Sequence, residues 1–128
     1  MGFVLIDVFS KIFLFAGIYN IGASITFIFG YKWFFPLIGM AIPNSLSFMY
    51  LAFAFVFVFG LGYLIVSKDL NKNYDIVKLG AFSKILAFLI IFQGCNVNIL
   101  PSILYVAAFI DLMWGAVFIY FIKNIRAL

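Results

Sequence analysis

Four long apolar runs, separated by short polar segments, make up most of the chain. They cover residues 11–31, 46–66, 76–92 and 102–122. Each run is about 17 to 21 residues long, which is the length that a helix needs to cross a hydrocarbon core of about 30 Å. We therefore predict an all-α, polytopic membrane protein, a bundle of four transmembrane helices that forms one integral membrane domain over residues 1–128.

Phenylalanines alternate with small apolar residues in the second run, at positions 53, 55, 57 and 59. A membrane-spanning strand would be about 10 residues long and would alternate apolar with polar residues, which this run does not do. On a helix, Phe53 and Phe57 form one ridge, and Phe55 and Phe59 form another that is nearly opposite. We expect one ridge to pack against protein and the other to face lipid.

Two segments beside the first run also have a pattern. Residues 2–10 are apolar apart from Asp7, which can pair with Lys11 one turn later, so we expect a short interfacial helix that leads into the first span. Trp33, Phe34 and Phe35 follow the run and are typical of an aromatic belt at the outer interface. A short helix or a partly re-entrant segment is the alternative there.

Composition supports the membrane assignment. Hydrophobic residues make up 68% of the chain and charged residues 9%, whereas soluble domains carry roughly 25% charged residues. Water could not solvate such a surface, so we expect membrane lipid to be a partner of the chain.

The basic residues predict the orientation. With a cytoplasmic N-terminus, only Lys32 lies on the outer side, and both termini are cytoplasmic by the positive-inside rule. The inner side then holds seven basic residues: Lys11, Lys68, Lys72, Lys78, Lys84, Lys123 and Arg126. Orientation and anionic lipid headgroups account for this positive charge, and we predict no nucleic-acid partner.

Missing residue types exclude many chemistries. The sequence has no His and no Glu, and Cys95 is its only cysteine. Haem, iron–sulfur, zinc and carboxylate-bridged metal centres therefore lack ligands, and Ser-His-Asp or Cys-His catalysis lacks its base. We predict no metal, no cofactor and no catalytic residue, and hence a protein that is not an enzyme.

Asp111 is an acidic residue at the centre of the last apolar run. A carboxylate at the bilayer midplane costs about 2.5 to 3.5 kcal/mol on insertion scales, so it normally faces protein or trapped water. At a rise of about 1.5 Å per residue, Asn20, Lys84 and Asp111 lie about 13, 12 and 16 Å from the cytoplasmic ends of their runs, which are comparable depths.

Small residues flank each of these polar positions, as they do on helix faces that pack closely in membranes. They are Ala16, Gly17, Ala23 and Ser24 around Asn20; Gly80, Ala81 and Ala87, with Phe88, around Lys84; and Ala107, Ala108 and Gly115 around Asp111. We predict a buried cluster of Asn20, Lys84 and Asp111, with Ser24, Ser83 and Tyr19 as outer members.

Three interpretations of this cluster stay open. The polar groups can act as structural contacts that fix the helix register. They can instead form a site for a proton, an ion or a lipid-like headgroup, with Asp111, Lys84, Asn20 and Ser24 as its residues. In the third interpretation Lys84 extends to the inner surface, which leaves Asp111 with Asn20 or a partner subunit.

Short motifs add a family resemblance. The four-run layout, Gly60-Leu61-Gly62-Tyr63 before a basic loop, residues 80–84 (GAFSK) at the start of the third run, and residues 111–118 in the fourth resemble DoxX-like small membrane proteins. The resemblance implies a four-helix bundle in the bacterial inner membrane and an accessory role beside a redox or transport partner. It implies no catalytic residue.

The sequence favours one functional class and leaves two others open. We predict a small integral membrane accessory protein, or a subunit of a larger membrane complex, that can bind a lipid or quinone-like ligand. The alternative is a homo-oligomeric small transporter or channel with a polar site at Asp111. The third class is a membrane enzyme in which Asp111 and Lys84 act as acid and base.

Overall fold

The computed structural model describes residues 2–125, which form helices joined by turns. The helices are α1 (Gly2–Leu37), α2 (Leu46–Lys68), α3 (Tyr74–Asn96) and α4 (Leu104–Tyr120), and a π-helical turn, η1 (Phe121–Ile125), continues α4. The all-α prediction is confirmed. Among the described residues, three segments are long and apolar enough to cross a membrane: α1, α2, and α4 together with η1, as Leu104–Ile125.

The first helix is longer than its predicted span. Residues 2–10 are helical and lead into the first apolar run as expected, in one unbroken helix with it, and Lys11 pairs with Asp7 at 3.1 Å. A kink at Gly30 then redirects the helix, because this residue leaves helical geometry (φ −110°, ψ 17°). The segment after the kink is a short helix, the alternative expected for residues 33–35, with Trp33 exposed and Phe35 buried.

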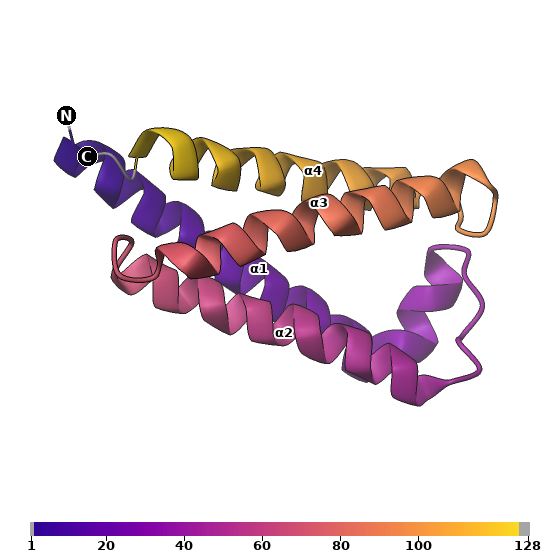
Figure 1. Ribbon diagram of the computed structural model, residues 1–128. Coiled ribbons are helices and arrows are strands. Elements are labelled where there is room, and N and C mark those ends of the chain that lie inside the picture. The colour runs from indigo at the N-terminus through magenta and orange to yellow at the C-terminus, as the bar shows by residue number, and fades with distance from the viewer. Residues whose placement is uncertain (1, 126–128) are drawn as a thin grey trace.

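The helices form two hairpins that diverge (Figure 1). Helix α1 packs along α2, and α3 packs along α4, whereas contact between the two hairpins is much sparser. The hairpins meet at the end that holds both termini and the α2–α3 turn, which we call the termini end. They separate midway along the helices, and the two connecting loops, residues 38–45 and 97–103, come close together again at the opposite end, which we call the loop end.

The hydrophobic core lies in the half of the bundle near the termini end. Phe13, Tyr63, Val66, Val77 and Phe118 are almost completely buried there. Aromatic rings join the hairpins, since Phe118 lies against Phe13 (centroids 5.0 Å apart) and Tyr63 (5.0 Å). Close packing of such large rings contributes much of the attraction between the two hairpins.

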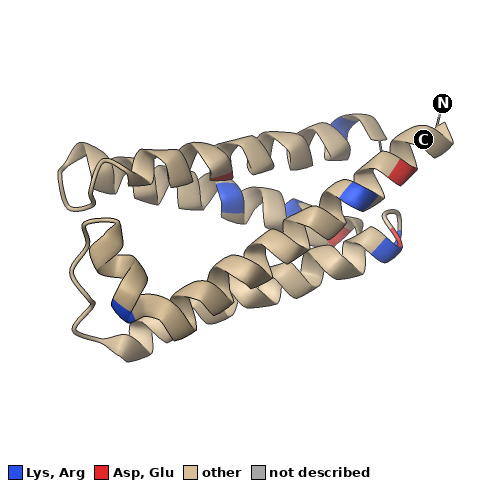
Figure 2. Cartoon of the chain, turned by 180° about the vertical axis from the view of Figure 1, so that it is seen from behind, with Lys and Arg blue, Asp and Glu red and all other residues tan. Residues whose placement is uncertain are grey.

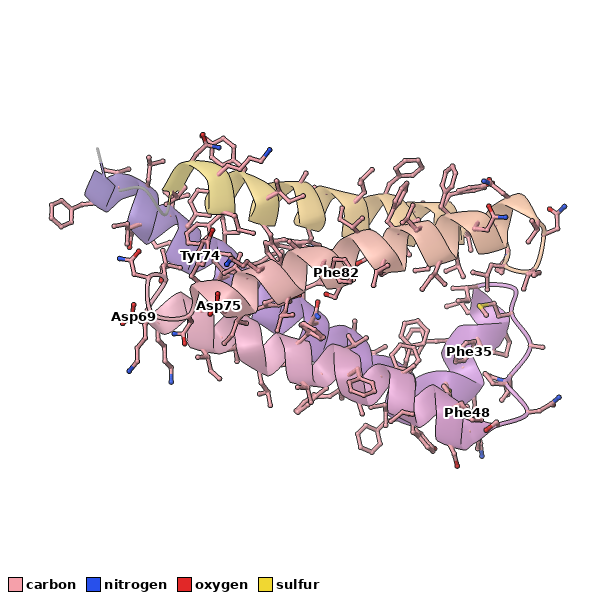
Figure 3. The ribbon with its side chains drawn as sticks, in the orientation of Figure 1. Phe35, Phe48, Asp69, Tyr74, Asp75 and Phe82 are labelled. Atoms are coloured by element: carbon pink, nitrogen blue, oxygen red, sulfur yellow. The ribbon has the colours of Figure 1, made fainter. Side chains whose placement is uncertain are left out.

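Charged residues gather at the termini end, and one acidic and one basic position lie side by side midway along the helices (Figure 2). Asp69 and Asp75 flank the α2–α3 turn, whereas Phe35 and Phe48 lie near the loop end (Figure 3). Arg126, counted above among the inner basic residues, lies outside the described residues.

The phenylalanine ridges of α2 do not divide as expected. Phe53 stacks on Phe27 of α1 with an interplanar angle of 3°, and Phe59, from the other ridge, packs against Tyr63 in the core. Phe55 is exposed. Both ridges therefore contact protein, because α2 is flanked by α1 on one side and α3 on another.

Candidate functional site

Asn20 is held in place by the close approach of α1 and α2. A Cβ atom added to Gly17 would lie 2.8 Å from the carbonyl oxygen of Gly60, so only glycine allows the two backbones to come this near. At this crossing Asn20 Nδ2 donates a hydrogen bond to the carbonyl oxygen of Val56 on α2, at 3.2 Å. The Asn20 side chain is thereby oriented with its Oδ1 atom available to a different helix.

Lys84 of α3 lies between Asn20 and Asp111. Its Nζ donates to Asn20 Oδ1 at 2.9 Å and to Asp111 Oδ1 at 3.4 Å, and only 9% of its side chain is exposed. A glycine again allows the helices to approach closely, since a Cβ on Gly115 of α4 would lie 2.8 Å from Cδ1 of Ile85, the residue next to Lys84. The predicted contact between Asn20, Lys84 and Asp111 is present, and we call these three residues the polar cluster.

The amine of Lys84 does not extend to a bundle end, so the third interpretation of the cluster is wrong. A flexible stem can carry an ammonium to the interface, but a carboxylate and an amide within the bundle offer a closer partner. The ring centroids of Tyr19 and Tyr63 each lie 5.9 Å from Nζ, which adds weak cation–π attraction.

Asp111 of α4 is the more accessible member of the cluster, with 18% of its side chain exposed. Its Oδ1 atom accepts from Lys84, and within residues 2–125 its Oδ2 atom has no hydrogen-bond partner. One carboxylate oxygen therefore remains free to accept a further hydrogen bond.

The outer members of the predicted cluster divide into two groups. Tyr19 and Ser83 line the same space as Lys84 and Asp111. Ser24 does not join them, because it is fully buried and its hydroxyl donates to the carbonyl oxygen of Ile21 on its own helix, at 2.8 Å. Ser24 thus contributes no group to the site.

A cleft of about 380 Å³ opens above the polar cluster, between the two hairpins. Its volume lies within the roughly 300–1,000 Å³ that is usual for ligand pockets, and its walls are mainly apolar, as ligand pockets are. All four helices line this inter-hairpin cleft, with Tyr19, Asn20, Ala23, Phe27, Phe53, Phe55, Val56, Phe59, Ser83, Lys84, Ala87, Ile91, Ala107 and Asp111.

The sequence pattern did not predict that Tyr63 and the phenylalanine walls belong to the site. Tyr63 is completely buried, and a Cβ on Gly80 would lie 2.6 Å from its ring, so a glycine on α3 makes its position possible. The available signal was the glycine pair at 60 and 62 just before it on α2. Phe27, Phe53 and Phe59 gave no signal, because nothing distinguishes a cleft-lining phenylalanine from a lipid-facing one in an apolar run.

The polar cluster offers hydrogen-bonding groups while its net charge is zero. Lys84 and Asp111 carry no net charge together, wherever the shared proton resides. The ammonium has three N–H donors, of which two are engaged, and Asp111 has a free acceptor. The polar cluster can therefore donate one hydrogen bond and accept another at the floor of an apolar cleft.

Comparison of the chain with models of protein families, with curated proteins and with solved structures gives no match.

Proposed function

We propose that this chain is a four-span protein of the bacterial inner membrane, with both termini cytoplasmic, that binds an amphipathic lipid or quinone-like molecule in the inter-hairpin cleft. In this role it is a small accessory protein or a subunit of a larger membrane complex, as the resemblance to DoxX-like proteins implies. The observation that carries the proposal is the joint presence of a mainly apolar cleft and a buried polar cluster at its floor.

A purely structural role for the polar cluster explains its position beside the cleft less well than ligand binding does. An ion pair that only fixes helix register gains most when both charges are enclosed and satisfied. Here the pair borders a cleft, and one carboxylate oxygen is free within the described residues. Polar groups with unused hydrogen bonds, facing an apolar space, are what an amphipathic ligand requires.

Binding also fits these residues better than catalysis. Lys84 is held by Asn20 and Asp111 at once, which leaves no separate acid and base at the floor of the cleft. The proposal therefore gives Lys84 and Asp111 a binding role.

The test compares the lipid bound by two variants in which an alanine of α4 is replaced with phenylalanine. Ala107 lines the cleft, whereas Ala116 is exposed on the same helix. Wild type, Ala107→Phe and Ala116→Phe are purified in mild detergent, their folding is compared by size-exclusion chromatography, and extracted lipids are quantified by mass spectrometry. We expect one amphiphile to be enriched in wild type and Ala116→Phe and depleted at least fivefold in folded Ala107→Phe.

Equal lipid content in all three proteins would contradict the proposal. A symmetric homo-oligomer with no enriched lipid would favour the alternative, a transporter or channel with its polar site at Asp111. One abundant heterologous protein that copurifies together with the lipid would support the subunit role.

A further inference from the structure

The inter-hairpin cleft has its polar groups at the bottom and its apolar walls toward the loop end. On α1, Ala23 and Phe27 follow Asn20 in the direction of the loop end, and on α3, Ala87 and Ile91 follow Lys84. The helices α2 and α4 run the opposite way. Accordingly, their wall residues Phe53, Phe55 and Ala107 precede the floor of the cleft in sequence.

The other side of the polar cluster is closed. About two helical turns toward the termini end, Phe13, Val77 and Phe118 are almost completely buried in the core. A ligand therefore reaches the cluster only from the cleft, with its polar group innermost.

This polarity is the reverse of that of a bilayer lipid. Asp111 lies about 10 Å from the first residue of α4, well inside a hydrocarbon core of about 30 Å. A phospholipid keeps its charged headgroup at the membrane surface and its tails at this depth. The cleft instead offers hydrogen bonds at this depth and apolar walls nearer the surface.

The charge of the cluster limits the headgroup. Lys84 and Asp111 sum to zero, and the other polar residues of the cleft, Tyr19, Asn20 and Ser83, are uncharged. A phosphate or an ammonium would enter as an unpaired charge in an apolar surrounding, which is strongly unfavourable. A hydroxyl, a carbonyl or a protonated carboxyl group would accept from Lys84, donate to Asp111, or do both.

We infer that the ligand is an amphiphile with a small, uncharged, hydrogen-bonding head, which binds head-inward with its apolar body directed toward the loop end. The inference rests on the proposed function and specifies its ligand class. Charged phospholipids and lipid-like anions or cations are excluded from the cleft by the neutral polar cluster.

The experiment uses photoreactive probes of one chain length. The full chain in lipid nanodiscs is crosslinked with a 12-carbon alcohol that carries a diazirine at the end of the chain far from the hydroxyl, and labelled peptides are mapped by mass spectrometry. The same diazirine chain with a phosphate head and with a trimethylammonium head provides the comparison. Variants are Ala107→Phe, which fills the cleft, and Lys84→Met/Asp111→Leu, which replaces the hydrogen-bonding floor with apolar side chains.

We expect the alcohol to label wall residues near the loop end, such as Phe27, Phe53 and Ile91, at least tenfold more than the phosphate or ammonium probe does. We expect a loss of this labelling of about tenfold in both variants, while labelling of lipid-facing residues stays unchanged. Unlabelled 1-dodecanol should compete with the probe, and dodecyl phosphate should not.

Two other results separate the inference from the proposed function. If a charged probe labels the cleft as strongly as the alcohol, or if the chain ends map beside the polar cluster, the inference is wrong although the cleft still binds amphiphiles. If no probe labels the cleft of wild type above the level of Ala107→Phe, both the inference and the proposed function are wrong.

Discussion

Replacing Asp111 with alanine tests whether the polar cluster stabilises the bundle as an ion pair. The change leaves the Lys84 ammonium, 9% exposed, with Asn20 as its remaining hydrogen-bond partner. Breaking a buried pair by removing one partner costs about 3–5 kcal/mol. We expect about 2–3 kcal/mol here, because the bond to Asn20 at 2.9 Å persists and the ion pair itself is long, at 3.4 Å.

The double variant Asp111→Ala/Lys84→Ala removes both charges and should cost less than the sum of the two single changes. A coupling free energy of about 2 kcal/mol lies within the range for directly contacting residues. The measurement is equilibrium unfolding in mixed micelles, followed by circular dichroism, for wild type, both single variants and the double variant. Additive losses within about 0.5 kcal/mol would refute the ion pair as a stabilising contact.

The chain offers a matched control at its surface. Lys78 and Asp75 also lie 3.4 Å apart, but their side chains are 53% and 90% exposed. Exposed pairs contribute little, so the same cycle at these positions should give a coupling free energy near zero. A coupling as large as that of Lys84 and Asp111 would show that the assay reports general charge effects rather than burial.

Three further outcomes follow from the packing. Gly17→Ala should lower the free energy of unfolding by about 1–3 kcal/mol, because its Cβ would clash with the α2 backbone; Gly22→Ala, whose Cβ meets nothing within 4 Å, should be neutral or stabilising in the same unfolding assay. Asn20→Ala should lower the free energy of unfolding by about 1–3 kcal/mol, because hydrogen bonds to α2 and α3 are lost, whereas Ser24→Ala should lower it by at most about 1 kcal/mol. Equal losses in the two variants would contradict the hydrogen bonds assigned to Asn20. The buried thiol of Cys95 should react with N-ethylmaleimide only after unfolding, as followed by intact-protein mass spectrometry, and fast reaction of the folded protein would contradict its burial.

The helices could be predicted because their signal is local. Apolar runs of span length fix where each helix lies, and the ends shift by only a few residues in α2 and α4. The first helix differs more: the apolar residues 2–10 predicted a helix but not its unbroken continuation into the span, and the kink at Gly30 has no counterpart in hydropathy. At Gly30 the ring of Phe34 occupies the place where a Cβ would lie, at 2.9 Å, a tertiary detail that an apolar run does not encode.

The polar cluster could be predicted because charges in an apolar run must find partners. The cost of burying Lys84 and Asp111 separately, together with similar depths and small neighbours, leads to their contact. The same reasoning includes Ser24 wrongly, because a serine can satisfy its hydroxyl on its own helix and needs no distant partner. The cleft could not be predicted, since the divergence of the hairpins depends on packing between residues far apart in sequence.

The pairing of Lys84 with Asp111 has a consequence for biosynthesis. While α3 emerges from the ribosome, the carboxylate that will accompany its lysine has not yet been made, because α4 follows α3 in the chain. On insertion scales, a lone lysine at the centre of a helix costs about 2.5 to 3.5 kcal/mol. Under the proposed four-span topology, integration of α3 is therefore most favourable when α4 enters the bilayer with it. The second hairpin would then insert as one unit, and a nascent chain that stops before residue 111 would hold α3 only weakly.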